Sequence, residues 1–154
     1  MSFRITGLDP APFQDLHALS DADLAAQQIH RVRVDEKPNA PCRISLADAE
    51  IGEHVLLLNY EHQPADTPYH QQGPIFVRET NARFDAVDVI PSALEVRLLS
   101  LRAFDAEGMM VAADVTEGAQ APALIDLFFA DSQVAYIQAH YARRGCYAAR
   151  ITRA

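Results

Sequence analysis

The sequence predicts an α+β protein whose sheet is mostly antiparallel, built from hairpins, with two or three short helices. Three observations predict this class. About eight short apolar runs have the length of strands. Two pairs of these runs are separated only by short turns, at residues 105–108 and 142–145. Helical patterning is brief, and strands do not alternate regularly with helices, which favours antiparallel pairing.

The N-terminal elements follow from local signals. Residues 3–8 alternate apolar and polar side chains and predict a strand. Ser20 is a good N-cap for a helix over 21–28, and Asp21 and Asp23 suit the positive end of its dipole. Three further segments follow: a strand over 29–36, a turn at 37–41 and one helical turn over 45–50.

The rest of the chain predicts three hairpins and one helix. Gly108 closes the turn of the second hairpin, where a glycine adopts positive φ easily. The helix at 121–130 places Leu124, Leu127 and Phe128 on one side. The hairpin strands are expected at 54–62 with 75–79, 95–104 with 109–115, and 134–141 with 146–151, and residues 83–91 are expected to be mostly irregular.

Length and charge bound the class of protein. The 154 residues predict a single domain over 1–154, large enough for one substantial core. The net charge of −8 argues against a general nucleic-acid partner. No apolar run reaches the length of a membrane span, and the first residues lack a secretory signal, so we expect a cytoplasmic protein with no membrane partner. No dinucleotide or phosphate-loop fingerprint appears, and no cofactor is expected.

The segment 57–79 is the strongest candidate for a functional site. It combines two strand-like apolar runs with chemically capable side chains. On the first strand Tyr60 and His62 share a face, about 7 Å apart along the backbone. Phe76 and Arg78 share a face of the partner strand, so Arg78 is a candidate partner for Tyr60 and His62. The predicted ligand-binding residues are Arg43, Tyr60, His62, Tyr69, Arg78 and Arg102, with the arginines holding an anionic group.

Metal and nucleophile chemistry have weaker support. His54, His62 and His70 are evenly spaced, but a strand over 54–62 separates its ends by roughly 26 Å, so we expect no metal site there. Cys146 follows two arginines, which favour a thiolate, and His140 lies across the same predicted hairpin. A buried, unreactive Cys146 is the commoner arrangement. His62, His140 and Cys146 are therefore the catalytic candidates, without an assigned reaction.

Several sequence blocks resemble a known bacterial family called "domain of unknown function 1203". The blocks lie at 41–49, 52–63, 68–69, 73–79, 97–105, 140–142 and 145–150. The resemblance covers nearly the whole chain and implies a single-domain bacterial protein of the family's fold. It implies no activity, since none is assigned to the family. His62 and His140 lie inside the blocks, whereas His70 does not belong to the pattern.

Three functions follow as hypotheses. The first is a domain that binds a small, anionic molecule near the 60–78 hairpin, with His62 or His140 as proton carrier if it is an enzyme. The second is a protein-interaction or structural module that forms a homodimer through an open strand edge. The third is a thiol-dependent enzyme that uses Cys146.

Overall fold

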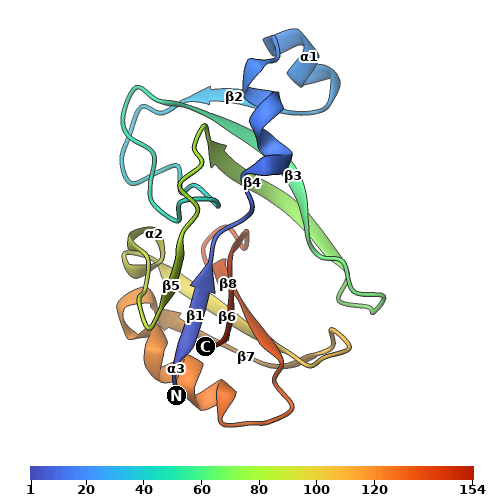
Figure 1. Cartoon of the computed structure of the whole chain (residues 1–154), viewed down its shortest axis with the longest axis vertical. Helices are drawn as coiled ribbons and strands as arrows, with labels where there is room; N and C mark the ends of the chain where they lie inside the picture. Colours follow the sequence, from blue (N-terminus) through green and yellow to red (C-terminus); the bar gives the residue numbers. More distant parts are fainter.

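Two antiparallel sheets form the protein, as a computed structural model of residues 1–154 shows (Figure 1). The smaller sheet has the strand order β2-β3-β4 and the larger one β5-β1-β9-β8-β6-β7. The strands of the smaller sheet are β2 (His30–Arg33), β3 (His54–Gln63) and β4 (Gln71–Arg78). Those of the larger sheet are β1 (Phe3–Thr6), β5 (Asp85–Val87), β6 (Leu98–Phe104), β7 (Met110–Glu117), β8 (Tyr136–Tyr141) and β9 (Tyr147–Arg153). The predicted α+β class with mostly antiparallel sheets is confirmed.

The smaller sheet is covered by N-terminal helices on one face. The 3₁₀ helix η1 (Ala11–Ala18) has prolines at its N-terminal end. Proline fits there because the first backbone N–H groups of a helix have no partner within the helix. The helix α1 (Asp21–Ala26) begins as predicted at Ser20, whose side chain accepts a hydrogen bond from the Asp23 amide. Phe13 and Leu24 from these helices pack on the apolar face of the sheet, which includes Leu56, Leu58, Ile75 and Val77.

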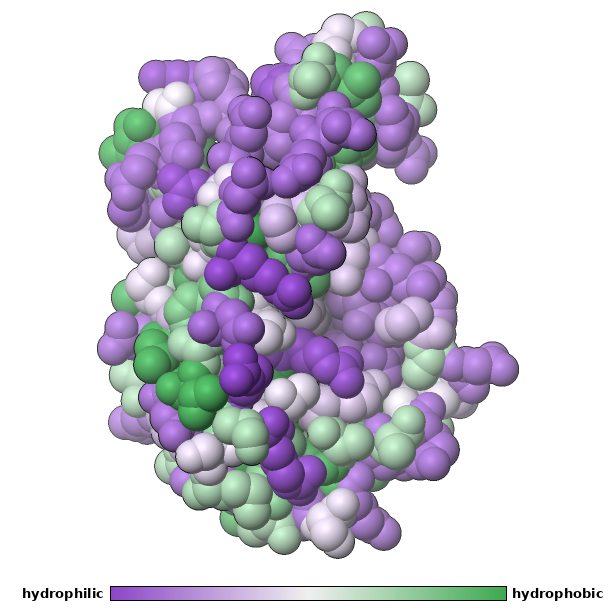
Figure 2. Space-filling view, viewed as in Figure 1, coloured by the Kyte–Doolittle hydropathy of each residue, from purple (hydrophilic) through white to green (hydrophobic).

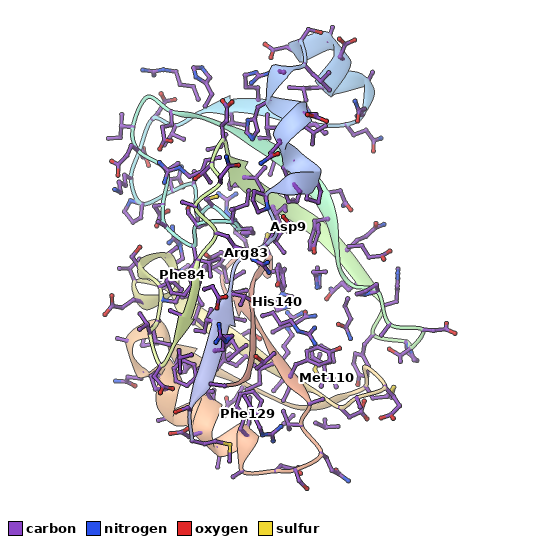
Figure 3. All side chains as sticks on the ribbon, viewed as in Figure 1. Asp9, Arg83, Phe84, Met110, Phe129 and His140 are labelled. Atoms are coloured by element: carbon purple, nitrogen blue, oxygen red, sulfur yellow. The ribbon has the colours of Figure 1, made fainter.

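The larger sheet has one apolar and one polar face. Leu101, Ile137 and their neighbours belong to the main core with Ile125 and Phe129 of α3 (Ala121–Phe129). The alternate positions of β6 and β8 carry Ser100, Arg102, Gln138 and His140. Figure 3 shows His140 between the two sheets, whereas Phe129 lies at α3 in the lower half. The polar face is therefore the one that meets the smaller sheet.

The β3–β4 hairpin extends from the smaller sheet toward the β6–β7 turn (Figure 1). Two side chains of the hairpin, Gln63 and Thr67, donate hydrogen bonds to the Gly108 carbonyl, each at 3.2 Å. Gly108 has a φ of 87°, as predicted, and a Cβ there would lie 2.4 Å from the Ala65 Cβ. Glycine is thus required at this contact both for backbone conformation and for space.

Short elements complete the fold. The helix α2 (Ser92–Glu95) precedes β6, and the 3₁₀ turn η2 (Gly118–Gln120) leads into α3. The segment 45–50, expected as a helical turn, instead forms turns closed by a bridge between Pro41 and Asp48. Both chain ends lie at the larger sheet, where the Ala154 amide donates to the Ser2 carbonyl at 3.1 Å.

No helix of the structure has the length and apolar character that crossing a membrane requires. The face of the molecule in Figure 2 is mostly hydrophilic, with an apolar patch on the left of its lower half. Exposed apolar side chains in the part of the chain around β5 and α2 include Val87, Val89 and Val96.

Candidate functional site

A buried polar network joins the hairpin to the larger sheet. The side chains of Gln63, Gln138 and His140 are nearly inaccessible to solvent. Gln138 Nε2 donates to the His62 carbonyl at 3.0 Å and to Gln63 Oε1 at 2.8 Å. Gln63 Nε2 in turn donates to the Gly108 carbonyl, which can only accept. This backbone contact fixes the orientation of the Gln63 amide and, through it, that of Gln138.

In this network both ring nitrogens of His140 face acceptor oxygens, although a neutral histidine ring carries only one N–H proton. Gln138 Oε1 lies 3.1 Å from His62 Nδ1 and 3.1 Å from His140 Nε2. His140 Nδ1 also faces an acceptor, the Gly145 carbonyl, at 3.0 Å. Both His140 nitrogens would need a proton to donate, yet burial, then the charge of Arg102, lowers the pKa of His140 to about 3. At neutral pH the ring therefore donates to one oxygen only.

Aromatic rings cover this network on the side of β9. The His62 ring stacks on Tyr147, with ring centroids 5.3 Å apart, and Tyr60 lies 6.1 Å from the same ring. Tyr60 and His62 thus share a face, as the strand parity predicts. Burial lowers the pKa of His62, and the charge of Arg102 acts in the same direction. Arg102 itself is half-buried, and its Nη1 donates to Gln71 Oε1 at 3.2 Å.

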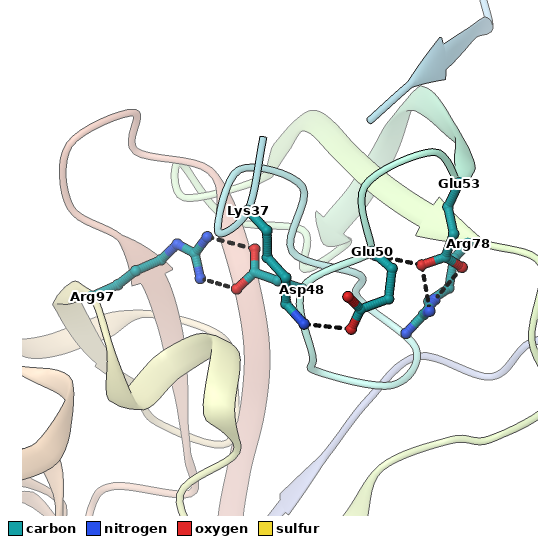
Figure 4. Close-up of polar contacts among 6 residues, drawn as sticks. All are labelled: Lys37, Asp48, Glu50, Glu53, Arg78 and Arg97. Atoms are coloured by element: carbon teal, nitrogen blue, oxygen red, sulfur yellow. Dashed lines mark hydrogen bonds and ion pairs between the residues drawn. The ribbon is translucent and has the colours of Figure 1, made fainter. Parts of the chain in front are cut away.

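Two predicted site residues lie elsewhere. Arg78 pairs with Val55 in the β3–β4 register, whereas Tyr60 pairs with Gly73, so Arg78 is distant from Tyr60 and on the opposite face. Its guanidinium donates to both carboxylate oxygens of Glu53, as Figure 4 shows. Tyr69 lies at the hairpin loop, with its ring 6.4 Å from Phe104. Neither residue joins the cluster around Tyr147.

A pocket of about 460 Å³ lies between the two sheets. Its apolar wall includes Leu57, Pro74 and Phe76 of the β3–β4 hairpin. Four arginines line it, Arg43, Arg97, Arg143 and Arg144, against a single acidic side chain, Glu117. We call this the arginine pocket. Its positive charge stands out on a chain whose net charge is −8.

Arg43 is the most deeply buried of these arginines, with 3% of its surface exposed. Its Nε donates to the Tyr147 carbonyl at 2.7 Å, and its Nη1 donates to the Pro41 carbonyl at 2.6 Å. No carboxylate lies within ion-pair distance. Nη2 makes no hydrogen bond and retains access to solvent. Burial lowers the pKa of Arg43, but an arginine stays charged at neutral pH.

Arg97 and Tyr141 form the inner wall of the arginine pocket. Arg97 donates to both Asp48 oxygens at 2.7 Å, a bidentate pair that Figure 4 shows. Burial alone would lower the pKa of Arg97, but the hydrogen bonds and charge of Asp48 raise it. The Tyr141 ring lies beside both guanidinium groups, 4.9 Å from Arg43 Cζ and 5.2 Å from Arg97 Cζ. Arg43 is therefore the one buried cation here without an acidic partner.

The Tyr141 hydroxyl is buried without a hydrogen-bond partner. Burial raises the pKa of Tyr141 to about 12, so the hydroxyl keeps its proton at neutral pH. An unsatisfied buried hydroxyl costs about 1–3 kcal/mol. Tyr141 forms part of the wall of the arginine pocket, but its hydroxyl itself is closed off from solvent.

Cys146 lies at the rim of the arginine pocket. It follows the β8–β9 turn, which is closed by a hydrogen bond from the Gly145 amide to the Tyr141 carbonyl at 2.7 Å. Cys146 is partly exposed, and its thiol has only a weak contact with the Arg144 carbonyl at 3.9 Å. Cys42 is fully buried, and both thiols are free. His140 and Cys146 are thus not joined by a hydrogen bond.

Apart from Tyr69 and Arg78, the predicted site residues divide between two places. Tyr60, His62, Arg102 and His140 surround the polar network, whereas Arg43 and Cys146 line the arginine pocket. Sequence reasoning missed Arg97 and Tyr141, because their roles depend on contacts distant in sequence. Arg143 and Arg144 were visible as neighbours of Cys146. No group of three His, Cys, Asp or Glu side chains lies close enough together to hold a metal ion.

A second pocket, of about 450 Å³, lies near η1 and includes His17, Arg78 and Glu79. The charge of Arg78 is already matched by Glu53. This pocket therefore offers an anion no unpaired buried cation.

The fold and the pockets define an α+β domain whose candidate binding site lies between its two sheets. The chain belongs to the family described as "Protein of unknown function (DUF1203)", whose model matches residues 39–153. This confirms the resemblance seen in the sequence. No curated protein and no solved structure matches the chain.

Proposed function

We propose that the protein is a binding domain for a small anionic molecule, which the arginine pocket holds through Arg43. One observation carries this proposal. Arg43 is almost completely buried, has no carboxylate partner, and keeps one free nitrogen in a pocket large enough for a small molecule. A buried charge without a counter-ion is costly, so a carboxylate or phosphate there gains a strong, charge-assisted hydrogen bond.

The rest of the arginine pocket supports the same chemistry. Arg143 and Arg144 at the rim add positive charge without ion-pair partners. Leu57, Pro74 and Phe76 supply an apolar wall. This combination suits a ligand with an apolar body and one acidic group, because ligand pockets are mostly apolar with a few polar groups that orient the ligand.

The polar network supports a structural role more strongly than a binding role. Most polar atoms of Gln63, Gln138 and His62 are already bonded to one another or to backbone. His62 and His140 nevertheless lie against the ring of Tyr147, whose carbonyl accepts a hydrogen bond from Arg43. A proton-carrying role for either histidine stays a prediction.

The test compares pairs of acids with their neutral amides by isothermal titration calorimetry. Benzoate with benzamide and hexanoate with hexanamide each differ only in charge, and inorganic phosphate tests an anion without an apolar body. We expect at least one acid to bind at least about ten times more tightly than its amide, since hydrogen bonds to charged groups contribute about 1.5–3 kcal/mol. The proposal is wrong if no acid binds more tightly than its amide and phosphate does not bind.

A double variant, Arg143→Gln with Arg144→Gln, tests the location. Both side chains are exposed, so the fold should be preserved. A variant with Arg4→Gln and Arg33→Gln removes the same charge from two side chains that do not line the arginine pocket and serves as control. We expect only the first variant to weaken binding of the acids.

The homodimer stays a prediction beside this proposal. The strand β7 is one of the edge strands on which pairing could occur, and it exposes Val111 and Val115. Light scattering of the purified protein would show a dimer or exclude it.

A further inference from the structure

The arginine pocket brings the Cys146 thiol together with positive charge and with unsatisfied buried donors. Arg143 and Arg144 precede Cys146 in the same turn, and all three residues line the pocket with Arg43. Thiolates, not thiols, are the nucleophiles, and nearby cations favour them.

Two independent features mark this thiol as lying beside a ligand site. Arg43 has only 3% of its surface exposed, and its Nη2 has no hydrogen-bond partner. Tyr141 is 7% exposed and its hydroxyl has no partner. The free Nη2 of Arg43 is suited to the acidic part of a molecule whose reactive part would lie at the rim, near Cys146.

We propose that Cys146 is a site of thiol–disulfide exchange with small disulfides that carry carboxylate groups. This inference rests on the proposed anion-binding function. The pocket would hold the carboxylate and so concentrate the disulfide at the thiol, which raises its apparent rate of reaction.

The exchange balances without a further reagent. The Cys146 thiol first loses its proton to water, and the thiolate attacks one sulfur of the disulfide. The original S–S bond breaks as a new S–S bond to Cys146 forms. The second sulfur leaves as a thiolate with the electron pair of the broken bond. Cys146 is thereby oxidised, and the departing half of the disulfide is reduced.

The experiment compares three disulfides of different charge with the native protein. They are 5,5′-dithiobis(2-nitrobenzoate), which carries two carboxylates, neutral 4,4′-dithiodipyridine and cationic cystamine. Each rate with the protein is divided by the rate of the same reagent with N-acetylcysteine, which removes differences in intrinsic reactivity. We expect this ratio to be at least about ten times larger for the anionic reagent than for the neutral one, and smallest for cystamine.

Variants show which cysteine reacts and which arginines cause the preference for the anionic reagent. Cys146→Ser should abolish the fast reaction, whereas Cys42, with no exposed surface, should react only after unfolding. Arg143→Gln with Arg144→Gln should bring the anionic and neutral ratios close together, and Arg4→Gln with Arg33→Gln should leave them unchanged. A tightly bound acid from the calorimetry should slow the reaction.

Equal ratios for the three reagents would overturn the inference, as would a preference that survives loss of Arg143 and Arg144. If the acids bind in calorimetry while Cys146 shows no preference, the inference fails and the proposed function stands. If no acid binds and no preference appears, both fail. A preference without measurable acid binding would also overturn the inference, because attraction of the reagent by the surface arginines would then explain the rate without a held carboxylate.

Discussion

His140 Nε2 lies 3.1 Å from Gln138 Oε1, although the other ring nitrogen of His140 also faces a carbonyl oxygen. This relationship makes the junction between the two sheets sensitive to pH. The charged groups around the ring are Arg102 on β6 and Arg43 in the loop before β3, with His62 on β3 and Tyr147 on β9 as titratable neighbours. The positive charges of the two arginines disfavour protonation of the His140 ring.

The free energy of unfolding should therefore depend on pH. His140 takes up its proton at a pKa of about 3 in the folded protein, against 6.5 in the unfolded chain. Between these values the unfolded state holds more protons, so stability is complete above pH 6.5 and falls as the pH drops. Between pH 7 and pH 5 this linkage amounts to about 2 kcal/mol.

The measurement is urea unfolding at pH 5 and pH 7. His140→Asn retains a donor near the Gly145 carbonyl and removes the titration, so its loss of stability between the two pH values should be about 2 kcal/mol smaller than that of the wild type. His54→Asn changes an exposed histidine and serves as control. An equal loss in His140→Asn and the wild type would contradict the assignment.

Gly108 is expected to tolerate no side chain. Gly108→Ala would force positive φ on alanine and place its Cβ against Ala65. We expect it to lose about 1–3 kcal/mol of stability in urea unfolding. Gly73 has ordinary φ and open space around it, so Gly73→Ala should have little effect. Similar stabilities for the two variants would show that the contact between the hairpin loop and the β6–β7 turn is loose.

Asp48 is expected to contribute strongly to stability. Its side chain is 6% exposed and binds Arg97 through both oxygens. Asp48→Asn would leave Arg97 without its counter-ion, which costs about 3–5 kcal/mol for a buried pair. Asp35→Asn breaks the exposed pair with Arg33 and should cost almost nothing. Thermal unfolding of both variants checks the difference, and equal melting temperatures would contradict it.

Local signals in the sequence predicted most of the strands and the shared face of Tyr60 and His62, because strand parity needs no tertiary information. The helix η1 was not among the predicted elements, although proline fits a first helical turn. On α3 the predicted apolar side was partly wrong. Leu127 is 67% exposed, while Ile125 and Phe129 are buried, because a nearly all-apolar helix does not reveal which side faces the sheet.

The candidate site depended on contacts that local patterns do not contain. Arg78 could be placed only once the β3–β4 register was known, and that register pairs it with Val55. Arg43 was predicted to hold an anion, but its surroundings come from Tyr147, which is 104 residues away in the sequence. The pairing of Asp48 with Arg97 is similarly distant. Packing between the sheets, rather than any motif, determines the arginine pocket.

The most direct measurement of the proposed function is a titration followed by NMR of backbone amides and arginine Nε–Hε groups. The titrant is the acid that binds best in calorimetry, with its amide as control. The account predicts saturable shifts of Arg43, Arg144 and Cys146 signals with the acid alone, and none at Glu79 or Asn81 in the second pocket. Saturable shifts that leave Arg43 and its neighbours unchanged would contradict it.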